Sequence, residues 1–146
     1  MRSQIFAGLA FGIVAVVAGA PVESSASEEQ ITINGAVFVR KDSNSNDNWD
    51  AITYVGLTLT TPSGSVSCDA DSFPDPSVPS NVYTCADPTY SFQISSRPSY
   101  NVYAVTVTHK VSDSVTLTGM TDVGCNGPIP MSCQQVGPRQ GTLTAA

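Results

Sequence analysis

Apolar and polar side chains alternate along much of this chain. Tyr90, Phe92 and Ile94 are separated by single polar residues, and the same alternation returns at Val115 and Leu117. A period of two is typical of strands that bury one face, and signals for helices are nearly absent after the N-terminal segment. The pattern therefore predicts half-buried strands that pair antiparallel.

The longest run of this kind extends from Tyr100 to Val111. Its parity predicts a core face formed by Tyr103, Val105, Val107 and Val111. The opposite face is predicted to be formed by Val102, Ala104, Thr106, Thr108 and Lys110.

The alternation changes register around Gly56. Positions 52 and 54 are apolar on one parity, whereas positions 55, 57 and 59 are apolar on the other. A β-bulge, or a strand that crosses between sheet faces, explains such a switch. The sequence Pro62-Ser63-Gly64 then predicts a turn, and a hairpin that leads into Cys68.

Short strands, frequent turn residues and the lack of helical segments predict an all-β fold. We expect a compact antiparallel β-barrel, or a barrel-like sandwich, formed by one domain over residues 31–146.

The N-terminus has the features of a secretory signal. A basic residue, Arg2, precedes an apolar run from Ile5 to Val17 and then small residues. We predict a signal peptide over residues 1–18, cleavage near 18–20, and a flexible polar leader over 19–30. Since no later apolar stretch is long enough to span a bilayer, we expect a secreted, extracellular protein without a membrane partner.

Charge argues against a nucleic-acid partner. The chain has six Lys and Arg residues against twelve Asp and Glu, a formal net charge of −6. Removal of Arg2 with the signal leaves five basic residues, too few and too scattered for a nucleic-acid-binding stripe.

The four cysteines, Cys68, Cys85, Cys125 and Cys133, favour disulfides, because a secreted protein matures in an oxidising compartment. Several pairings are open from the sequence alone. Local pairing would fix two loops, and the first would close a segment rich in proline and aspartate. A metal site lacks the paired spacing and the histidines that it would need, so we expect no cofactor and no metal.

One histidine is the only candidate for acid–base chemistry. His109 lies on the core parity of its strand, and Asp113 follows four residues later. No nucleophile motif accompanies this pair, and a histidine satisfied at the end of a core strand is the commoner arrangement. We therefore expect no catalytic residue and no enzymatic activity.

Candidate binding residues lie in two polar segments. Asp69, Asp71 and Asp75 lie between the first two cysteines, and Trp49 lies in the segment 41–50. That segment resembles a calcium loop in its alternate oxygen side chains, but it lacks the glycine and the glutamate that such a loop requires. Trp49 either anchors a partner or folds back onto the barrel.

The order of several short motifs resembles the fungal secreted family typified by the major Alternaria allergen. These motifs are Tyr54-Val55-Gly56-Leu57 before the hairpin, Tyr83 before Cys85, Lys110-Val111-Ser112-Asp113, Cys125-Asn126-Gly127-Pro128 and Cys133-Gln134. The resemblance covers about Ile31 to Leu143.

This resemblance implies a β-barrel with two local disulfides, Cys68 with Cys85 and Cys125 with Cys133. It also implies an allergen-like effector or elicitor that binds host proteins, with thaumatin-like pathogenesis-related proteins among the expected partners. The typifying allergen has a further cysteine that links two subunits, and the segment Glu28 to Gly35 has none. A pair of subunits, if it forms, is therefore expected to be non-covalent.

From these observations we expect a secreted fungal effector that acts without catalysis, by binding a host extracellular defence protein. The alternative is a carrier of an apolar or phenolic small molecule, in the barrel or at a dimer interface. The carrier would be favoured if Phe92 and Tyr103 lined an accessible cavity. A cell-wall-active hydrolase is the third hypothesis.

Overall fold

The computed structural model describes residues 27–41, 50–127 and 131–146, and these form strands joined by turns and loops. The strands are β1 (Glu28–Lys41), β2 (Ala51–Thr61), β3 (Gly64–Ala70), β4 (Tyr83–Thr84), β5 (Tyr90–Ser99), β6 (Val102–Lys110), β7 (Thr116–Asn126), β8 (Ser132–Gln135) and β9 (Arg139–Ala145). The predicted all-β class is confirmed. The predicted signal peptide and Trp49 lie outside the described residues. No helix that could cross a membrane occurs in the described ranges.

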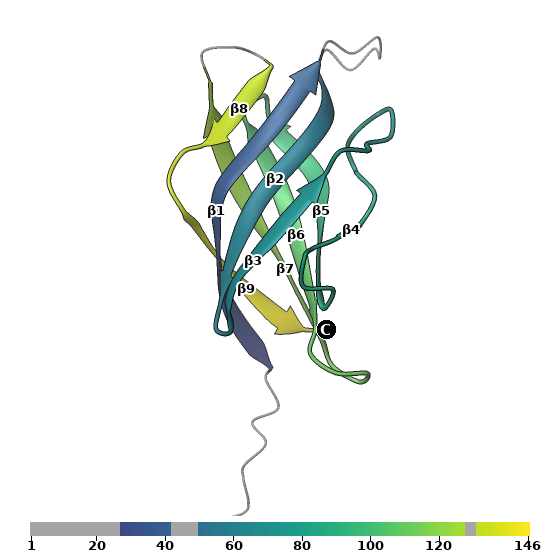
Figure 1. Ribbon diagram of the computed structural model, residues 1–146, viewed down its shortest axis with the longest axis vertical. Helices are drawn as coiled ribbons and strands as arrows, with labels where there is room; N and C mark the ends of the chain where they lie inside the picture. Colours follow the sequence, from purple (N-terminus) through teal and green to yellow (C-terminus); the bar gives the residue numbers. More distant parts are fainter. Residues whose placement is uncertain (1–26, 42–49, 128–130) are drawn as a thin grey trace, which may run out of the picture.

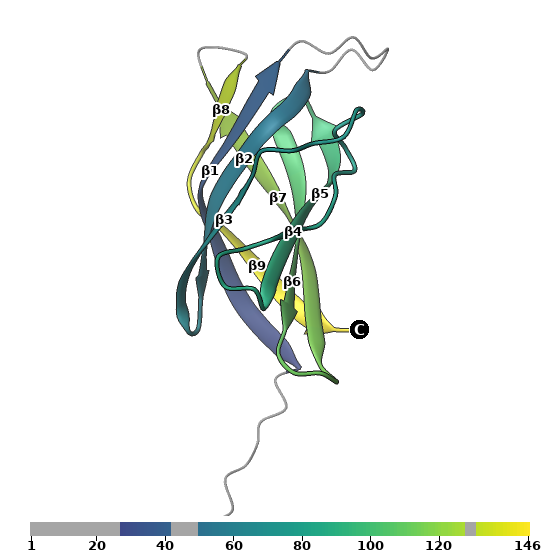
Figure 2. The ribbon, with the colours of Figure 1, turned by 45° about the vertical axis from the view of Figure 1, so that its right-hand side comes forward.

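The described strands make one antiparallel sheet in the order β3-β2-β1-β8-β7-β6-β5-β4, while β9 pairs with both β1 and β7. The sheet curls so that its outer strands, β3 and β4, come into contact (Figures 1 and 2). We call the end where β1 begins the lower end and the end where β1 stops the upper end, as they lie in Figure 1.

The two edges of the curled sheet are joined covalently. Cys68 in β3 and Cys85, directly after β4, form a disulfide, and the Ala86 N–H donates to the Ser67 carbonyl at 2.8 Å. Cys125 and Cys133 form the second disulfide, which ties β7 to β8. Both local pairings are those that the family resemblance implies. The expected barrel-like architecture braced by two disulfides is thereby confirmed.

The segment between β3 and β4 closes the upper half of the sheet. The hydroxyl oxygens of Ser77 and Ser80, both buried, accept hydrogen bonds from the Ile52 N–H at 3.0 Å and the Ile94 N–H at 2.9 Å. Ser80 also donates its own N–H to the Ile94 carbonyl. This proline-rich segment therefore spans from β2 to β5 and satisfies backbone groups that a neighbouring strand would otherwise pair.

The core follows the predicted parity with two corrections. Tyr103, Val105 and Val107 are buried as expected, but Val111 is 42% exposed. The strand ends at Lys110, and Val111 begins the turn into β7, so the alternation does not reach it. Ala104, assigned to the outer face, is buried, beside an irregularity in the register between β5 and β6.

The register switch predicted in β2 is confirmed as a bulge. Val39 pairs with Tyr54 and Arg40 pairs with Ile52, which leaves Thr53 without an opposite residue. This extra residue moves the buried positions of β2 from even to odd numbers.

A second bulge in β1 was not predicted. The register between β1 and β2 shifts between Asn34 and Val37, and Gly35 there has a φ of 58°. Because left-handed backbone favours glycine, Gly35 accommodates the shift. The buried positions of β1 accordingly change from odd numbers, which end at Ile33, to even numbers, which begin at Ala36.

At the same bulge β1 changes its neighbour. Glu28–Ile33 pair with β9, whereas Val37–Val39 pair with β8. The side-chain amide of Gln135 fills the interval: its oxygen accepts from the Ala36 N–H and its nitrogen donates to the Ile33 carbonyl, both at 2.8 Å. The side-chain amide of Gln135 therefore makes two hydrogen bonds to the backbone of β1 that a neighbouring strand would otherwise make.

The first strand also begins earlier than expected. Glu28, Glu29 and Gln30 pair with residues 142–144 of β9, so residues 28–30 belong to the sheet and not to a flexible leader.

We predict that loss of the first disulfide, unlike loss of the second, releases the outer strands of the sheet. The double variant Cys68→Ser/Cys85→Ser should lower the free energy of unfolding by about 3 kcal/mol, by the loop-entropy estimate. Its amide hydrogens in β3 and in β4–β5 should exchange faster, because these edges are then joined by few remaining contacts. Urea unfolding and hydrogen exchange measure the two effects.

Cys125→Ser/Cys133→Ser is the matched control, because β7 and β8 remain paired within the sheet. It should destabilise the protein while leaving exchange at β3 and β4 unchanged. Equal exchange profiles in the two double variants would contradict the proposed role of the first disulfide.

Candidate binding surface

The three predicted aspartates lie on β3 and in the segment that follows it. Asp69 lies on the outer face of β3, and Asp71 and Asp75 lie in the segment that follows; all three are exposed. No group of three potential metal-ligating side chains occurs among the described residues. Of the three aspartates, Asp69 lines a depression of the surface.

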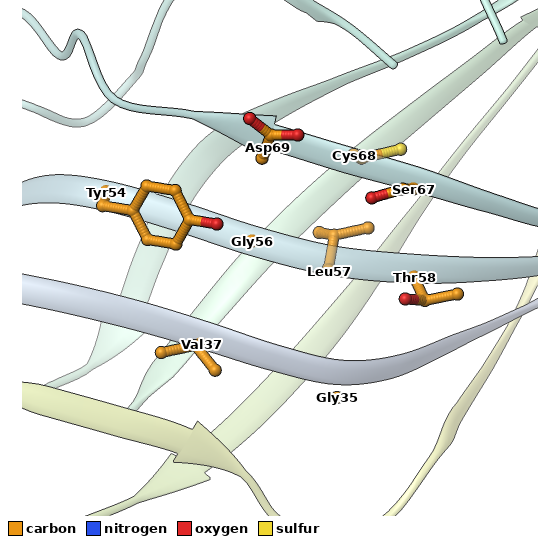
Figure 3. Close-up of a pocket in the computed structure, with 9 residues that line it drawn as sticks. All are labelled: Gly35, Val37, Tyr54, Gly56, Leu57, Thr58, Ser67, Cys68 and Asp69. Atoms are coloured by element: carbon orange, nitrogen blue, oxygen red, sulfur yellow. The ribbon is translucent and has the colours of Figure 1, made fainter. Parts of the chain in front are cut away.

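That feature is a depression of about 300 Å³ on the outer face of β1, β2 and β3, which we call the outer depression (Figure 3). Its lining residues are Gly35, Val37, Tyr54, Gly56, Leu57, Thr58, Ser67, Cys68 and Asp69. Val37, Gly56 and Asp69 are register partners on the three strands, so they form one row across the sheet. Antiparallel pairing thus collects residues from distant parts of the sequence.

Gly56 and Tyr54 determine the shape of the outer depression. Figure 3 shows the Tyr54 ring lying along β2 toward Gly56. A Cβ atom on residue 56 would come within 2.5 Å of the Tyr54 hydroxyl oxygen, so only glycine allows the ring to lie there without moving. The tyrosine is 37% exposed, so part of its ring remains accessible to solvent.

Polar groups at the outer depression have unused binding capacity. Within the described ranges the Asp69 carboxylate takes part in no ion pair, and neither it nor the Tyr54 hydroxyl has a hydrogen-bond partner. The Tyr54 hydroxyl can donate and accept, whereas an ionised Asp69 only accepts. The depression therefore offers an anionic group, an aromatic ring and an apolar wall at Val37.

The candidate catalytic pair is not assembled. His109 Nδ1 lies 2.6 Å from Glu29 Oε2, and its ring stacks on Tyr90 with centroids 3.9 Å apart. Asp113 instead pairs with Lys110 at 3.0 Å on the exposed surface. His109 is therefore a partly buried histidine with a carboxylate partner at the lower end of the barrel.

Glu29 joins that histidine to a buried tyrosine. The Tyr90 hydroxyl donates to Glu29 Oε1 at 2.7 Å. Burial, reinforced by the neighbouring Glu29 carboxylate, raises the pKa of Tyr90 to about 12. Through Glu29 the first strand is held against β5 and β6.

A second polar cluster at the upper end was missed by the sequence analysis. Arg40 is 2% exposed; it donates to the Tyr100 carbonyl at 2.9 Å and stacks on the Tyr100 ring. Arg97 donates to the same carbonyl, and burial lowers its pKa. Phe38 stacks on Tyr103 just below, with centroids 4.0 Å apart. Only the unpredicted bulge at Gly35 places Arg40 on the inward parity.

The fold defines a class of small all-β proteins whose curled antiparallel sheet is closed by a disulfide between its outer strands. Residues 33–144 match the family described as Alternaria alternata allergen 1, and the chain belongs to this family. No curated protein and no solved structure matches the sequence. The suspected resemblance is thus confirmed over nearly the whole described domain.

We predict a loss of stability in alkali that depends on Tyr90. An unfolded tyrosine ionises near pH 10, whereas folded Tyr90 ionises near 12, so the unfolded state binds fewer protons between these pH values. Since one pKa unit corresponds to about 1.4 kcal/mol, this residue should remove up to about 3 kcal/mol of stability over that interval.

Tyr90→Phe should start less stable at pH 8, because it lacks the hydrogen bond to Glu29, and should then lose less stability up to pH 12. Urea unfolding at each pH measures this, with Tyr54→Phe as the control. Parallel pH curves for Tyr90→Phe and the unmodified protein would contradict the assignment.

Proposed function

We propose that this protein is a secreted fungal effector or elicitor that acts by binding a host extracellular defence protein, without catalysis. Its membership of an allergen family is the observation that carries the proposal. A domain closed by a disulfide supports it, because such a scaffold holds exposed side chains in fixed positions for recognition.

The distribution of polar chemistry also favours binding over catalysis. His109 and Glu29 are engaged with each other and with Tyr90, in a packed position. Asp69 and Tyr54, by contrast, face solvent without partners among the described residues. The groups most available to a second molecule therefore lie on the outer sheet face.

A carrier of apolar small molecules is less well supported. Phe92 and Tyr103 are 1% and 0% exposed, and each packs against another aromatic ring. The outer depression is lined by neither of them. Side chains thus fill the positions where the carrier hypothesis needs an accessible cavity.

We predict salt-sensitive binding to a basic thaumatin-like pathogenesis-related protein. A basic member of that class would carry charge opposite to the net −6 of this chain, so raising NaCl from about 0.05 to about 0.5 M should weaken binding several-fold by screening. Isothermal titration with the purified, oxidised mature protein measures the dissociation constant at each salt concentration.

Recovery of partners from plant extracellular fluid, followed by mass spectrometry, broadens the same test beyond one candidate. Cys68→Ser/Cys85→Ser is the matched variant, since it releases the edge that carries Asp69, and it should lose the partner. If no host protein binds saturably, or if binding ignores both salt and the variant, the proposed function is wrong.

A further inference from the structure

We infer that the outer depression binds a cationic side chain, arginine or lysine, presented by a partner protein. The inference rests on the proposed function, which it extends by naming the chemical group that is recognised. Three independent properties of the depression lead to it: charge, an aromatic face and shape.

The charge comes from Asp69. Its carboxylate is exposed at the rim, and no described side chain neutralises it. The chain as a whole is acidic, with a net charge of −6, and exposed Asp71 follows two residues later. A carboxylate with free acceptor sites, in a negative field, selects a cationic donor over a neutral or anionic group.

The aromatic face comes from Tyr54. Its ring lies over the sheet and keeps 37% exposure, so an accessible π face stands close to the row that contains Asp69. Cations are attracted to the face of an aromatic ring, and arginine makes this contact more often than lysine. A ring and a carboxylate in the same depression satisfy one guanidinium group in two ways.

The shape comes from the two glycines that line the depression. The Tyr54 ring lies over Gly56, whereas no atom lies within 4 Å of the position that a Cβ on Gly35 would take, so the surface of β1 beside Val37 is open. A long aliphatic stem can lie across this floor and pack on Val37 while its charged end reaches Asp69. The open depression suits one side chain of a large molecule better than an enclosed small ligand.

The first test uses N-acetylarginine amide as the probe and N-acetylcitrulline amide as its neutral isostere. Both are titrated at low salt into the full oxidised protein labelled with ¹⁵N. We expect saturable amide shifts at Tyr54, Gly56 and Asp69 with the arginine probe, and much smaller shifts with citrulline. Equal responses to the two probes, or shifts centred elsewhere, would overturn the inference.

Three variants locate the binding groups. Asp69→Asn removes the charge, Tyr54→Leu removes the ring, and Gly56→Ala displaces the Tyr54 ring without changing charge. Each should raise the dissociation constant of the arginine probe at least about threefold. Asp122→Asn is the control, because it removes one exposed carboxylate from the outer face of β7; it should change the constant less than the other three.

The same variants separate this inference from the proposed function. If Asp69→Asn and Gly56→Ala bind the host protein as well as the unmodified chain does, the depression is not the recognition site, although the proposed function stands. If the arginine probe binds as expected but no host protein does, the site is real and the proposed function is wrong. Loss of the depression's exposure on self-association, seen as concentration-dependent shifts without any probe, would assign the surface to a second copy and overturn the inference.

Discussion

The bond between Cys68 and Cys85 closes a sheet that would otherwise present two free edges. β3 and β4 are the outermost strands of the sheet, and β4 has only two residues, so backbone pairing alone could join them over only a short stretch. The disulfide and the hydrogen bond from Ala86 to Ser67 bring these edges together. Once they are joined, the segment that follows β3 is held over the remaining opening, where Ser77 and Ser80 complete the backbone hydrogen bonds. Closure removes the exposed edges at which β proteins associate, and it fixes the outward faces as well as the core.

Polar groups close the two ends of an apolar interior. Glu29 with His109 and Tyr90 occupies the lower end, and Arg40 with Tyr100 occupies the upper end. Charged side chains reach such positions only when they are hydrogen-bonded or paired, and both clusters meet that condition. The ionisable groups of both clusters therefore contribute to the packing of the barrel ends. The polar groups that line the outer depression, around Gly56, lie instead on the outer face of the sheet.

Much of the fold could be predicted because a period of two is a local property of the sequence. The bulge in β2 and the buried positions of β5 and β6, apart from Ala104, follow from nearby residues alone. The bulge at Gly35 does not, because a single glycine gives no sign of a change in register. The role of Gln135 could not be predicted either, since its side-chain oxygen accepts a hydrogen bond from the Ala36 N–H, which lies 99 residues away in the sequence.

The candidate surface could likewise be predicted only in part. Asp69 was predicted from its place between two cysteines, whereas its proximity to Gly56 and Tyr54 depends on the pairing of β2 with β3. A tyrosine two residues before a glycine in a strand was the available signal, since aromatic rings commonly cover strand glycines.

Glu29 also sets a lower limit on the length of the folded chain. It lies at the second position of β1, and one carboxylate accepts from Tyr90 and contacts His109 on strands that are distant in the sequence. A protease that stopped before Glu28 would leave this junction intact. Removal of three more residues would take away the carboxylate and the first pairs with β9, leaving the Tyr90 hydroxyl without its acceptor. Proteolytic cleavage before Glu28 therefore keeps the contacts of the lower end, whereas cleavage after Glu29 removes them.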